Sequence, residues 1–430
     1  MREMKDSGME WIGEIPVDWE LSKIGSVYDE RNEKVSDKDF APLSVTKQGI
    51  VPQLETAAKT DNGDNRKLIR KNDFVINSRS DRRGSCGISE YEGSCSLINI
   101  VLKPQINVCN RYYGFVFKSD SFADEYYRWG HGIVDDLWST KWTDMKSIYI
   151  PVPDIVEQEK IADYLDAKCS KIDKIIEKQQ AIIEKLKEYK LSIITEVVTK
   201  GLNPDVEMME SGAEFVGKIP QNWSIAKLGN LFDFIGGYAF NSEMYVSESQ
   251  NQVVRIGNVK NGYMLLDSNP VFVNDETAER ANKFLIKPNY ILFTMTGTKG
   301  KRDYFFTHVV TEEDCKGKRL YINQRVGCFV AKKGVHPAYY GYLLKDNKIL
   351  DGIFLYETGT ANQGNLGIDS ISRTKVHVPP YEEQCKIAEY LDKKCNMIDS
   401  NIYEKGRLII KFQEYKKSLI YEVVTGKKEV

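Results

Sequence analysis

The sequence predicts an α/β protein in which two mixed α/β domains are separated by an antiparallel two-helix coiled coil. An internal tandem repeat gives the chain pseudo-twofold symmetry. A long segment with one apolar seam, residues 157–200, returns in register at 383–426. A short N-terminal segment returns at 211–233. A block of strand-like runs and Gly- and Asn-rich turns follows each short segment, which predicts the two domains.

The chain begins with the short segment, and its copy matches it residue by residue. The matched pairs are Ser7 and Ser211, Gly8 and Gly212, Glu10 and Glu214, Gly13 and Gly217, Ile15 and Ile219, Pro16 and Pro220, and Trp19 and Trp223. We therefore place framework segments at 1–19 and 202–223. Because the second segment joins the first long helix to the second block, we expect the first to dock where the last helix ends.

The two blocks fill residues 20–152 and 224–378. Block one has strand-like runs at 73–77 and 96–102, and block two has them at 253–257, 290–296 and 326–331. Each block also carries an aromatic helix-like run, RYYGFVF from Arg111 and HPAYYGYLL from His336. This mixture predicts one mixed α/β domain per block.

Long helices are predicted at 153–201 and 379–430, because apolar residues recur there at helical steps along one face. The seam consists of Ile161, Leu165, Ile172, Ile176, Ile183, Leu186, Ile193 and Val197 in the first helix, and Ile387, Leu391, Ile398, Ile402, Ile409, Phe412, Leu419 and Val423 in the second. A helix of this kind is ~65 Å long and needs a partner of equal length. An antiparallel return needs no long connection, so we expect the two helices to pair; the alternative is two separate amphipathic helices, each packed on its own domain.

The composition excludes several classes of protein. The chain has 60 basic and 62 acidic residues, which does not indicate a simple basic nucleic-acid binder. It has no apolar run long enough to span a membrane, and we expect a cytoplasmic protein with no membrane partner. The eight cysteines form no CxxC pair and the four histidines are scattered, so no metal site is predicted.

Three catalytic signatures fail on inspection, and no catalytic residue is predicted. VPPY at Val378 to Tyr381 resembles an amino-methyltransferase loop, but valine cannot accept the hydrogen bond that this chemistry needs. Pro153 and Asp154 followed by Asp166 and Lys168 match a loose nuclease spacing on what should be an exposed helix face. TGTKGKR at 296–302 lacks the first glycine of a phosphate-binding loop, which excludes ATP as a cofactor of this chain.

Polar loops that follow strands are the remaining candidates for function. NSRSDRRG follows DFVI in block one, and TMTGTKGKR follows YILF in block two. Such loops offer cations for phosphates and guanine edges, and hydroxyls and amides for other base edges. The candidate DNA-binding residues are Thr46, Lys47, Gln48, Asn77, Ser78, Arg79, Ser80, Arg82, Arg83, Ser139, Thr140 and Lys141 in block one, and Arg255, Asn258, Lys260, Thr296, Thr298, Lys299, Lys301, Arg302, Asn323, Gln324, Arg325, Asn362 and Gln363 in block two.

The whole chain resembles the specificity subunit of a Type I DNA restriction and modification system. The resemblance is carried by DSGMEWIGEIPVDW and its copy ESGAEFVGKIPQNW, by EVVTKGLNP at 196–204, and by the EQxKIAxYLD helix starts at Glu157 and Glu383. DFVINSRSDRRG, VVRIGNVKNG and TGTANQGNLG add to it.

This resemblance implies two target-recognition domains that each read one half of a bipartite site in double-stranded DNA, separated by the helical pair. It implies docking of two modification subunits, which use S-adenosylmethionine to methylate adenine N6, and of two motor-nuclease restriction subunits, which use ATP and Mg. The chain itself is then not an enzyme and holds no cofactor. The alternatives are a stand-alone DNA nuclease or methyltransferase with duplicated recognition heads, and a coiled-coil adaptor that does not bind DNA.

Overall fold

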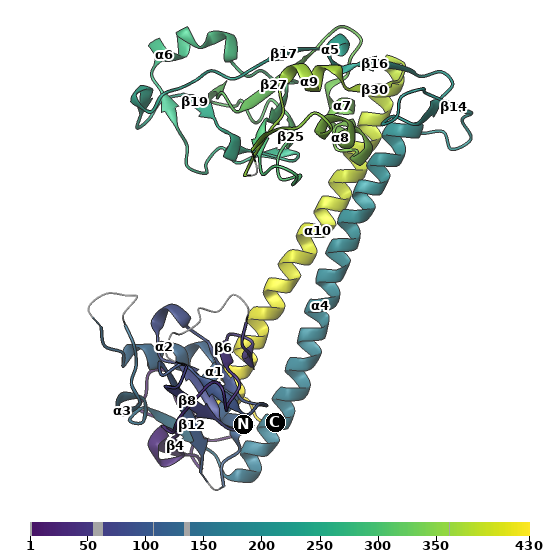
Figure 1. Ribbon diagram of the computed structural model, residues 1–430. Helices are drawn as coiled ribbons and strands as arrows, with labels where there is room; N and C mark the ends of the chain where they lie inside the picture. Colours follow the sequence, from purple (N-terminus) through teal and green to yellow (C-terminus); the bar gives the residue numbers. More distant parts are fainter. Residues whose placement is uncertain (1, 55–62, 106, 133–137, 361) are drawn as a thin grey trace. The chain divides into compact units, whose positions relative to one another are not determined.

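The computed structural model describes residues 2–54, 63–105, 107–132, 138–360 and 362–430 (Figure 1). Met1 and residues 55–62, 106, 133–137 and 361, which belong to the predicted segments 1–19, 20–152 and 224–378, lie outside the described residues. The chain divides into two compact units: unit 1 is Met1–Ala181 with Lys405–Val430, and unit 2 is Ile182–Glu404. Helices α4 (Ile155–Lys200) and α10 (Tyr381–Val424) each contribute one part to each unit.

In each unit, the start of one long helix packs against the end of the other. In unit 1, Ile161 and Leu165 of α4 share a core with Leu419 and Val423 of α10. In unit 2, Ile194 and Val197 of α4 share a core with residues of α10 that include Ile387 and Leu391. The two helices are therefore antiparallel within each unit. The predicted seam residues are all buried or half-buried.

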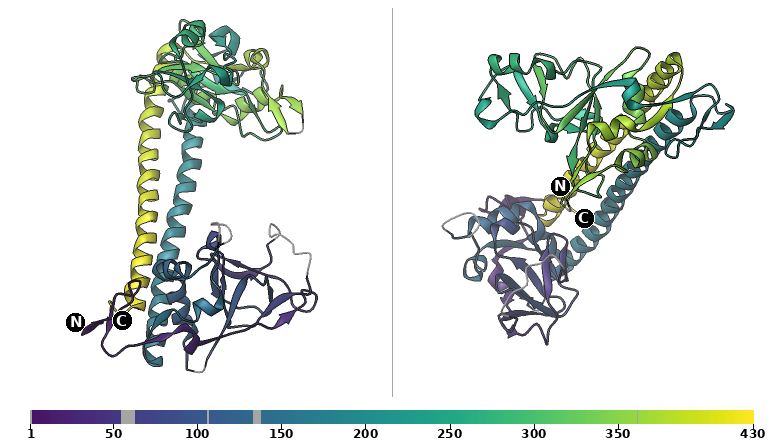
Figure 2. Two further views of the ribbon diagram at one scale, coloured as in Figure 1. Left: turned by 90° about the vertical axis from the view of Figure 1, so that its left-hand side faces the viewer. Right: turned by 45° about the horizontal axis from the view of Figure 1, so that its top comes forward.

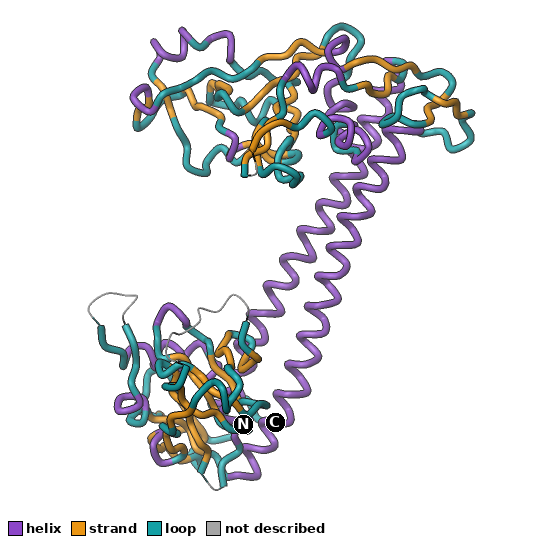
Figure 3. The backbone as a smooth tube through the Cα atoms, in the orientation of Figure 1, coloured by secondary structure: helices purple, strands orange, loops and turns teal. Residues whose placement is uncertain are grey.

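Most strands of unit 1 gather beside the ends of the two long helices, with the short helices among them (Figure 3). Its central antiparallel sheet has the order β10-β9-β12-β4, and three smaller sheets and a hairpin surround it. The elements are β1 (Met4–Asp6) with β2 (Glu14–Pro16), β3 (Glu20–Lys23) with β13 (Tyr149–Val152), β10 (Cys86–Ile88), β9 (Phe74–Asn77), β12 (Asn99–Pro104), β4 (Tyr28–Glu30), β11 (Gly93–Cys95), β8 (Arg66–Ile69), β5 (Lys34–Val35), β6 (Leu43–Thr46), β7 (Gly49–Pro52), α1 (Asn110–Lys118), α2 (Asp120–Arg128) and α3 (Trp142–Met145).

Unit 2 repeats this plan with additions. Its central sheet has the order β25-β23-β27-β17, and a second four-stranded sheet has the order β18-β22-β19-β26. The elements are β14 (Met208–Glu210) with β15 (Lys218–Pro220), β16 (Ser224–Lys227) with β30 (Lys375–Val378), β25 (Thr307–Val309), β23 (Ile291–Thr294), β27 (Val326–Ala331), β17 (Phe232–Ile235), β18 (Tyr245–Val246), β22 (Phe272–Val273), β19 (Asn251–Val254), β26 (Arg319–Ile322), β20 (Val259–Lys260), β21 (Tyr263–Met264), β24 (Thr296–Gly297), β29 (Gln363–Asn365), β28 (Thr358–Thr360), α5 (Leu228–Leu231), α6 (Asp275–Arg280), α7 (Pro337–Leu343), α8 (Asn347–Phe354) and α9 (Ile368–Arg373).

We call residues 20–152 head 1 and residues 224–378 head 2. In both heads an aromatic helix, α1 or α7, packs on the central sheet and links it to the long helices. The Tyr112 hydroxyl donates to the Val424 carbonyl over 2.8 Å, and the Tyr339 hydroxyl donates to the Val198 carbonyl over 2.9 Å. The heads are thus two versions of one mixed α/β domain, and the prediction of two such domains is confirmed.

The N-terminal segment docks on the end of α10, as the repeat predicts. Trp11 and Ile15 belong to the same core as Val423, and the Tyr421 hydroxyl donates to the Ile12 carbonyl over 3.0 Å. The two chain ends lie next to each other in both Figure 1 and Figure 2. Gly426 ends the helix with φ +73°, and a Cβ there would lie 2.4 Å from Pro16, so this close approach requires glycine.

A tryptophan fixes the start of each long helix. Trp19 donates from Nε1 to the Glu157 carboxylate over 2.8 Å, and Trp223 donates to the Glu383 carboxylate over 3.0 Å. A carboxylate near a helix N-terminus is also stabilised by the helix dipole. Within the described residues, neither α4, α10 nor any shorter helix is long and apolar enough to cross a membrane.

Candidate nucleic-acid interface

In head 1, the loop that follows β9 pairs with the segment that follows α2. Arg79 and Ser139 form an antiparallel bridge. The Ser80 amide donates to the Trp138 carbonyl over 3.1 Å, and the Thr140 amide donates to the Ser78 carbonyl over 3.0 Å. Two candidate segments that are far apart in the sequence are therefore neighbours on one face of head 1.

Two cavities gather the remaining candidates of head 1. A cavity of about 840 Å³ is lined by Thr46, Lys47 and Gln48 of the β6–β7 turn and by Asn77 and Arg82. A smaller cavity of about 310 Å³ is lined by Ser78, Ser139, Thr140 and Lys141. Both cavities reach Ile98 and Asn99 at the start of β12, so they adjoin each other.

Asn99 is a buried polar residue at the base of these two cavities, and it was not among the predicted site residues. It is 4% exposed, it pairs with Asn77 across β9 and β12, and its Oδ1 has no hydrogen-bond partner among the described residues. Burial raises the pKa of the Cys95 thiol to about 11, and a hydrogen bond from the Asn99 side chain opposes that rise. The Asn99 acceptor is therefore both buried and unused. The only sequence signal was an asparagine at the first position of an apolar strand.

Several candidates of head 1 have internal partners. The Arg83 guanidinium forms an ion pair with Asp124 and donates to the Asp120 carbonyl over 3.2 Å. The hydrogen bond from Arg83 holds the pKa of the Asp124 carboxyl below its ordinary value. Thr140 is fully buried and its hydroxyl donates to the Tyr126 carbonyl over 2.8 Å.

Arg79 and Arg82 are the other two cations of this loop, and Arg83 is exposed as well. Arg79 is half-buried and Arg82 is exposed, with Asp81 3.4 Å from its Nε. An exposed ion pair with a sequence neighbour is weak, since water screens it. Lys47, Gln48 and Lys141 are also exposed.

In head 2, a small sheet brings two candidate loops together. β24, at the start of the Thr296–Arg302 loop, pairs with β29, and Thr296 lies opposite Asn365. The Met295 amide donates to the Arg325 carbonyl over 3.1 Å, and the Asn323 amide donates to the Val254 carbonyl over 3.0 Å. The candidates that follow β19, β23 and β26 therefore meet at one edge of head 2.

The Thr296–Arg302 loop is tied to its surroundings at several points. Lys299 donates from Nζ to the Gly359 carbonyl over 2.8 Å, and the Thr298 amide donates to the Asp303 carboxylate over 2.8 Å. The Gly300 amide donates to the Glu357 carboxylate over 3.0 Å. Arg302 forms an ion pair with Asp351. The loop is therefore held in shape before any ligand is bound.

Arg255 and Asn258 hold their own turn. Asn258 is 3% exposed, donates from Nδ2 to the Leu265 carbonyl over 2.8 Å and accepts from the Arg255 amide over 2.9 Å. Arg255 donates to the Asn269 carbonyl over 2.6 Å. The candidates of head 2 that are exposed are Lys299, Lys301, Arg302, Gln324, Arg325, Asn362 and Gln363, while Lys260, Thr296, Thr298 and Asn323 are half-buried.

The residues of the rejected catalytic signatures have structural roles. Asp154 accepts from the Glu157 amide over 2.9 Å and so caps α4. Asp166 forms an ion pair with Arg111 of α1 over 2.8 Å. The Pro379 carbonyl accepts from Gln384 over 2.9 Å at the start of α10. Across the described ranges, no cluster of acidic, cysteine and histidine side chains could hold a metal ion.

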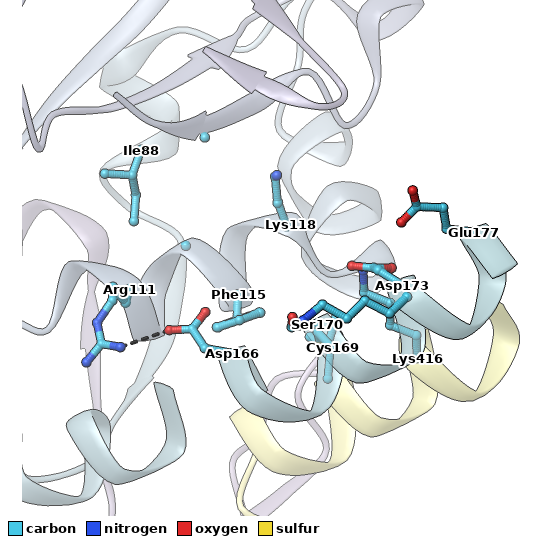
Figure 4. A pocket seen from close by; sticks show the side chains of 14 residues that line it. Ile88, Arg111, Phe115, Lys118, Asp166, Cys169, Ser170, Asp173, Glu177 and Lys416 are labelled. Carbon is cyan, nitrogen blue, oxygen red and sulfur yellow. Dashed lines mark hydrogen bonds and ion pairs between the residues drawn. The ribbon is translucent and has the colours of Figure 1, made fainter. Parts of the chain in front are cut away.

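Head 1 also has a groove of about 750 Å³ between α1 and α4 (Figure 4). Lys118, Asp173 and Glu177 line it, and Figure 4 shows the ion pair of Arg111 and Asp166 at one side. In unit 2, the Tyr342 hydroxyl donates to Asp392, the equivalent of Asp166, over 2.7 Å. The lining of the groove contains none of the candidate DNA-binding residues.

The geometry defines a class of protein: a tandem-duplicated binding protein whose two related heads each present polar and basic loops. The chain belongs to the family of the Type I restriction modification DNA specificity domain, whose model matches residues 16–188 and 220–411, one stretch for each head. This match does not favour the alternatives of a stand-alone nuclease or methyltransferase or of an adaptor that does not bind DNA.

Known relatives agree with this assignment over the whole chain. The putative type I restriction enzyme MjaX specificity subunit of Methanocaldococcus jannaschii is 23% identical, and the match covers 97% of this chain and 95% of that protein. The MjaVIII specificity subunit of the same organism is 23% identical, with 96% and 93% covered.

Solved structures show the same fold. A chain from a type I R-M system, solved for its complex assembly and conformational transition, has a TM-score of 0.71 at 13% identity, with 96% of this chain and 99% of that chain covered. The HsdS subunit from Thermoanaerobacter tengcongensis has a TM-score of 0.51 at 14% identity, with 96% and 98% covered.

Proposed function

We propose that this chain is the sequence-specific DNA-binding subunit of a Type I restriction-modification complex, and that each head reads one half of a bipartite site. One observation carries the proposal: both heads build the same loop pair on the same sheet edge but fill it with different side chains. Arg79 opposite Ser139 in head 1 corresponds to Thr296 opposite Asn365 in head 2. Equal frameworks with unequal contact residues suit two different half-sites.

The DNA contacts of each head are assigned to the exposed or half-buried polar residues of these loops. In head 1 they are Lys47, Gln48, Asn77, Arg79, Arg82 and Lys141, and in head 2 they are Lys301, Gln324, Arg325, Asn362 and Gln363. Arginine and lysine suit phosphates and guanine edges, and asparagine and glutamine suit adenine edges.

The reactions of the complex are assigned to partner subunits. Two modification subunits supply S-adenosylmethionine and methylate adenine N6, and two motor-nuclease subunits supply ATP-dependent cleavage with Mg, so the chain itself is not an enzyme. Exposed apolar residues at equivalent places on the long helices support docking of two equal partners: Tyr189 is 56% exposed and its equivalent Tyr415 is 51% exposed. A cytoplasmic location follows from DNA as the target.

The test is a comparison of adenine methylation across the host genome with and without this chain. The proposal expects one split motif to lose methylation when the chain is deleted and to regain it on complementation. Four residues inserted into α4 at the unit boundary should change or abolish the accepted spacer and leave both half-sites unaltered, because the helices link the heads. Altered bases within a half-site, or a methylation pattern that ignores the chain, would refute the proposal.

A further inference from the structure

Two ion pairs, one in each head, occupy equivalent positions. Arg83 ends the loop that follows β9 and pairs with Asp124 of α2. Arg302 ends the loop that follows β23 and pairs with Asp351 of α8. Each aspartate is the fifth residue of its helix, and each helix directly follows the aromatic helix of its head.

The helices that carry the two aspartates are held in place by packing and by N-caps. Phe122 and Tyr126 bury one face of α2, and Ile349 and Ile353 bury one face of α8. Each helix also has a side-chain N-cap: Ser119 accepts from the Phe122 amide over 3.3 Å, and Asp346 accepts from the Ile349 amide over 3.2 Å.

The same loops are held at their beginnings as well. Strand pairing ties Arg79 to Ser139 in head 1 and Thr296 to Asn365 in head 2. Each loop is therefore fastened at its start to the segment after the second helix and at its end to the helix itself. Between these two points the sequences differ, NSRSDRRG against TMTGTKGKR, yet each has an arginine, Arg83 or Arg302, at or next to its last position.

We infer that Arg83 and Arg302 are positioning residues, which fasten each recognition loop to its second helix and do not bind phosphate. This inference rests on the proposed DNA-binding function of the loops. An arginine suits the role because its guanidinium presents donors in a fixed planar arrangement that matches a carboxylate. Arg83 uses this arrangement, since it also donates to the Asp120 carbonyl over 3.2 Å.

Removal of the aspartate separates this role from a phosphate contact. DNA is negatively charged, so loss of a carboxylate beside a phosphate-binding arginine should strengthen binding. Loss of a carboxylate that only holds the loop should weaken binding, as loss of the arginine does. The salt dependence differs as well. Each lost phosphate contact makes the negative slope of log K against log salt less steep by about 0.9, whereas loss of a loop anchor leaves the slope unchanged.

The experiment uses the full chain assembled with its modification subunits and a fluorescent duplex that carries the methylated motif. The variants are Arg83→Ala, Asp124→Ala, their double mutant and the exchange Arg83→Asp with Asp124→Arg, together with the same set at Arg302 and Asp351. The control is Glu184→Ala with Lys187→Ala, which removes another exposed ion pair, of 2.8 Å, from α4.

Each single substitution should weaken binding about two- to fivefold, as expected for an exposed ion pair. The double mutant should be no weaker than either single mutant, the exchange should recover affinity, and the salt slope should stay constant. Tighter or unchanged binding by Asp124→Ala, or a less steep salt dependence of binding for Arg83→Ala, would overturn the inference. A wild-type complex that does not bind the duplex would instead refute the proposed function.

Discussion

The two heads share a central sheet but differ in polarity at the cross-strand pair next to the loops. In head 1 the pair is Asn77 and Asn99, and at the same register in head 2 it is Thr294 and Val326. Thr294 is satisfied, since its hydroxyl accepts from the Phe306 amide over 3.0 Å, and Val326 is fully buried. Duplication therefore kept the sheet, while the chemistry at its loop edge diverged.

The heads also differ in how their cores are filled. Phe117 of head 1 packs against a ring cluster that includes Tyr28, Phe74 and Phe122, whereas its equivalent in head 2 is the aliphatic Leu344. Both side chains are 1% exposed. One framework therefore accepts an aromatic or an aliphatic side chain at this core position, provided that the volume is filled.

The largest effect should come from emptying these core positions. Phe117→Ala should lower the free energy of unfolding of unit 1 by about 3–5 kcal/mol, and Leu344→Ala should lower that of unit 2 by about 2–5 kcal/mol. Denaturant unfolding followed by hydrogen exchange would show which unit opens. The comparison fails if either substitution destabilises both units equally, because each core should act on its own head.

Acid should affect head 2 more than head 1, because His377 of head 2 stands where head 1 has Pro151. His377 is 1% exposed, and burial lowers its pKa to about 4. Asp346 opposes this shift and Lys348 adds to it.

The sign follows from proton linkage. Between pH 6.5 and pH 4 the imidazole binds a proton in the unfolded chain, where its pKa is near 6.5, but stays neutral in the folded chain. The free energy of unfolding of unit 2 is therefore not reduced by His377 above about pH 6.5. Below that pH it falls, by up to about 3 kcal/mol as the pH drops toward 4. Unfolding measured from pH 7 to pH 4 checks this, and His377→Leu should remove the dependence. An unchanged dependence in that variant would assign the effect to other groups.

Asn99 gives the sharpest test of how the heads differ in recognition. Asn99 lines both cavities of head 1, and its acceptor is covered in the free chain, so it would meet the amino group of adenine or cytosine only where DNA binding uncovers it. A wrong base at a read position costs about 1–3 kcal/mol. Asn99→Ala should therefore relax one position of the half-site read by head 1, while Asn99→Asp, which keeps an acceptor, should retain it. Genome-wide adenine methylation in cells that carry each variant measures this.

The other half-site and a second buried amide serve as controls. Recognition by head 2 should stay intact in the same cells, which reports correct folding and assembly. Asn110→Ala should lower stability without changing the motif, because Asn110 already donates to the Asn72 carbonyl over 2.7 Å and accepts from the Tyr28 hydroxyl over 2.5 Å. If Asn99→Ala leaves the motif unchanged, its orphan acceptor has no part in recognition.

Much of the fold was predictable because it depends on periodic patterns that the duplication repeats. The apolar seam from Ile161 to Val197 recurs in the second long helix, and the framework tryptophan Trp19 recurs as Trp223. A pattern that occurs twice in one chain rarely arises by chance. The head topology was less accessible: short strands such as Lys34–Val35 and Thr296–Gly297 are set by pairing with distant segments rather than by their own residues.

Site residues were harder still, because sequence position does not show which side chains are already bonded. Arg83 and Arg82 are neighbours in one basic loop, yet only the fold brings Asp124 to Arg83. Asn258 has the residue type of a base reader but is buried within its own turn. Asn99 is the reverse case, a residue within a strand whose unused acceptor becomes visible only when β9 and β12 are paired.

The smallest effects should come from the ion pairs between the long helices. Lys416 lies 2.7 Å from Asp173 in unit 1, and Lys190 lies 2.6 Å from its equivalent partner Asp399 in unit 2. Their exposures are alike, with side chains 29% and 57% exposed in the first pair and 27% and 52% in the second. Asp173→Ala and Asp399→Ala should therefore each cost about 0.2–1 kcal/mol, less at high salt. Thermal unfolding at two salt concentrations measures both losses of stability. A clear difference between the two losses would show that the two equivalent ion pairs no longer contribute equally.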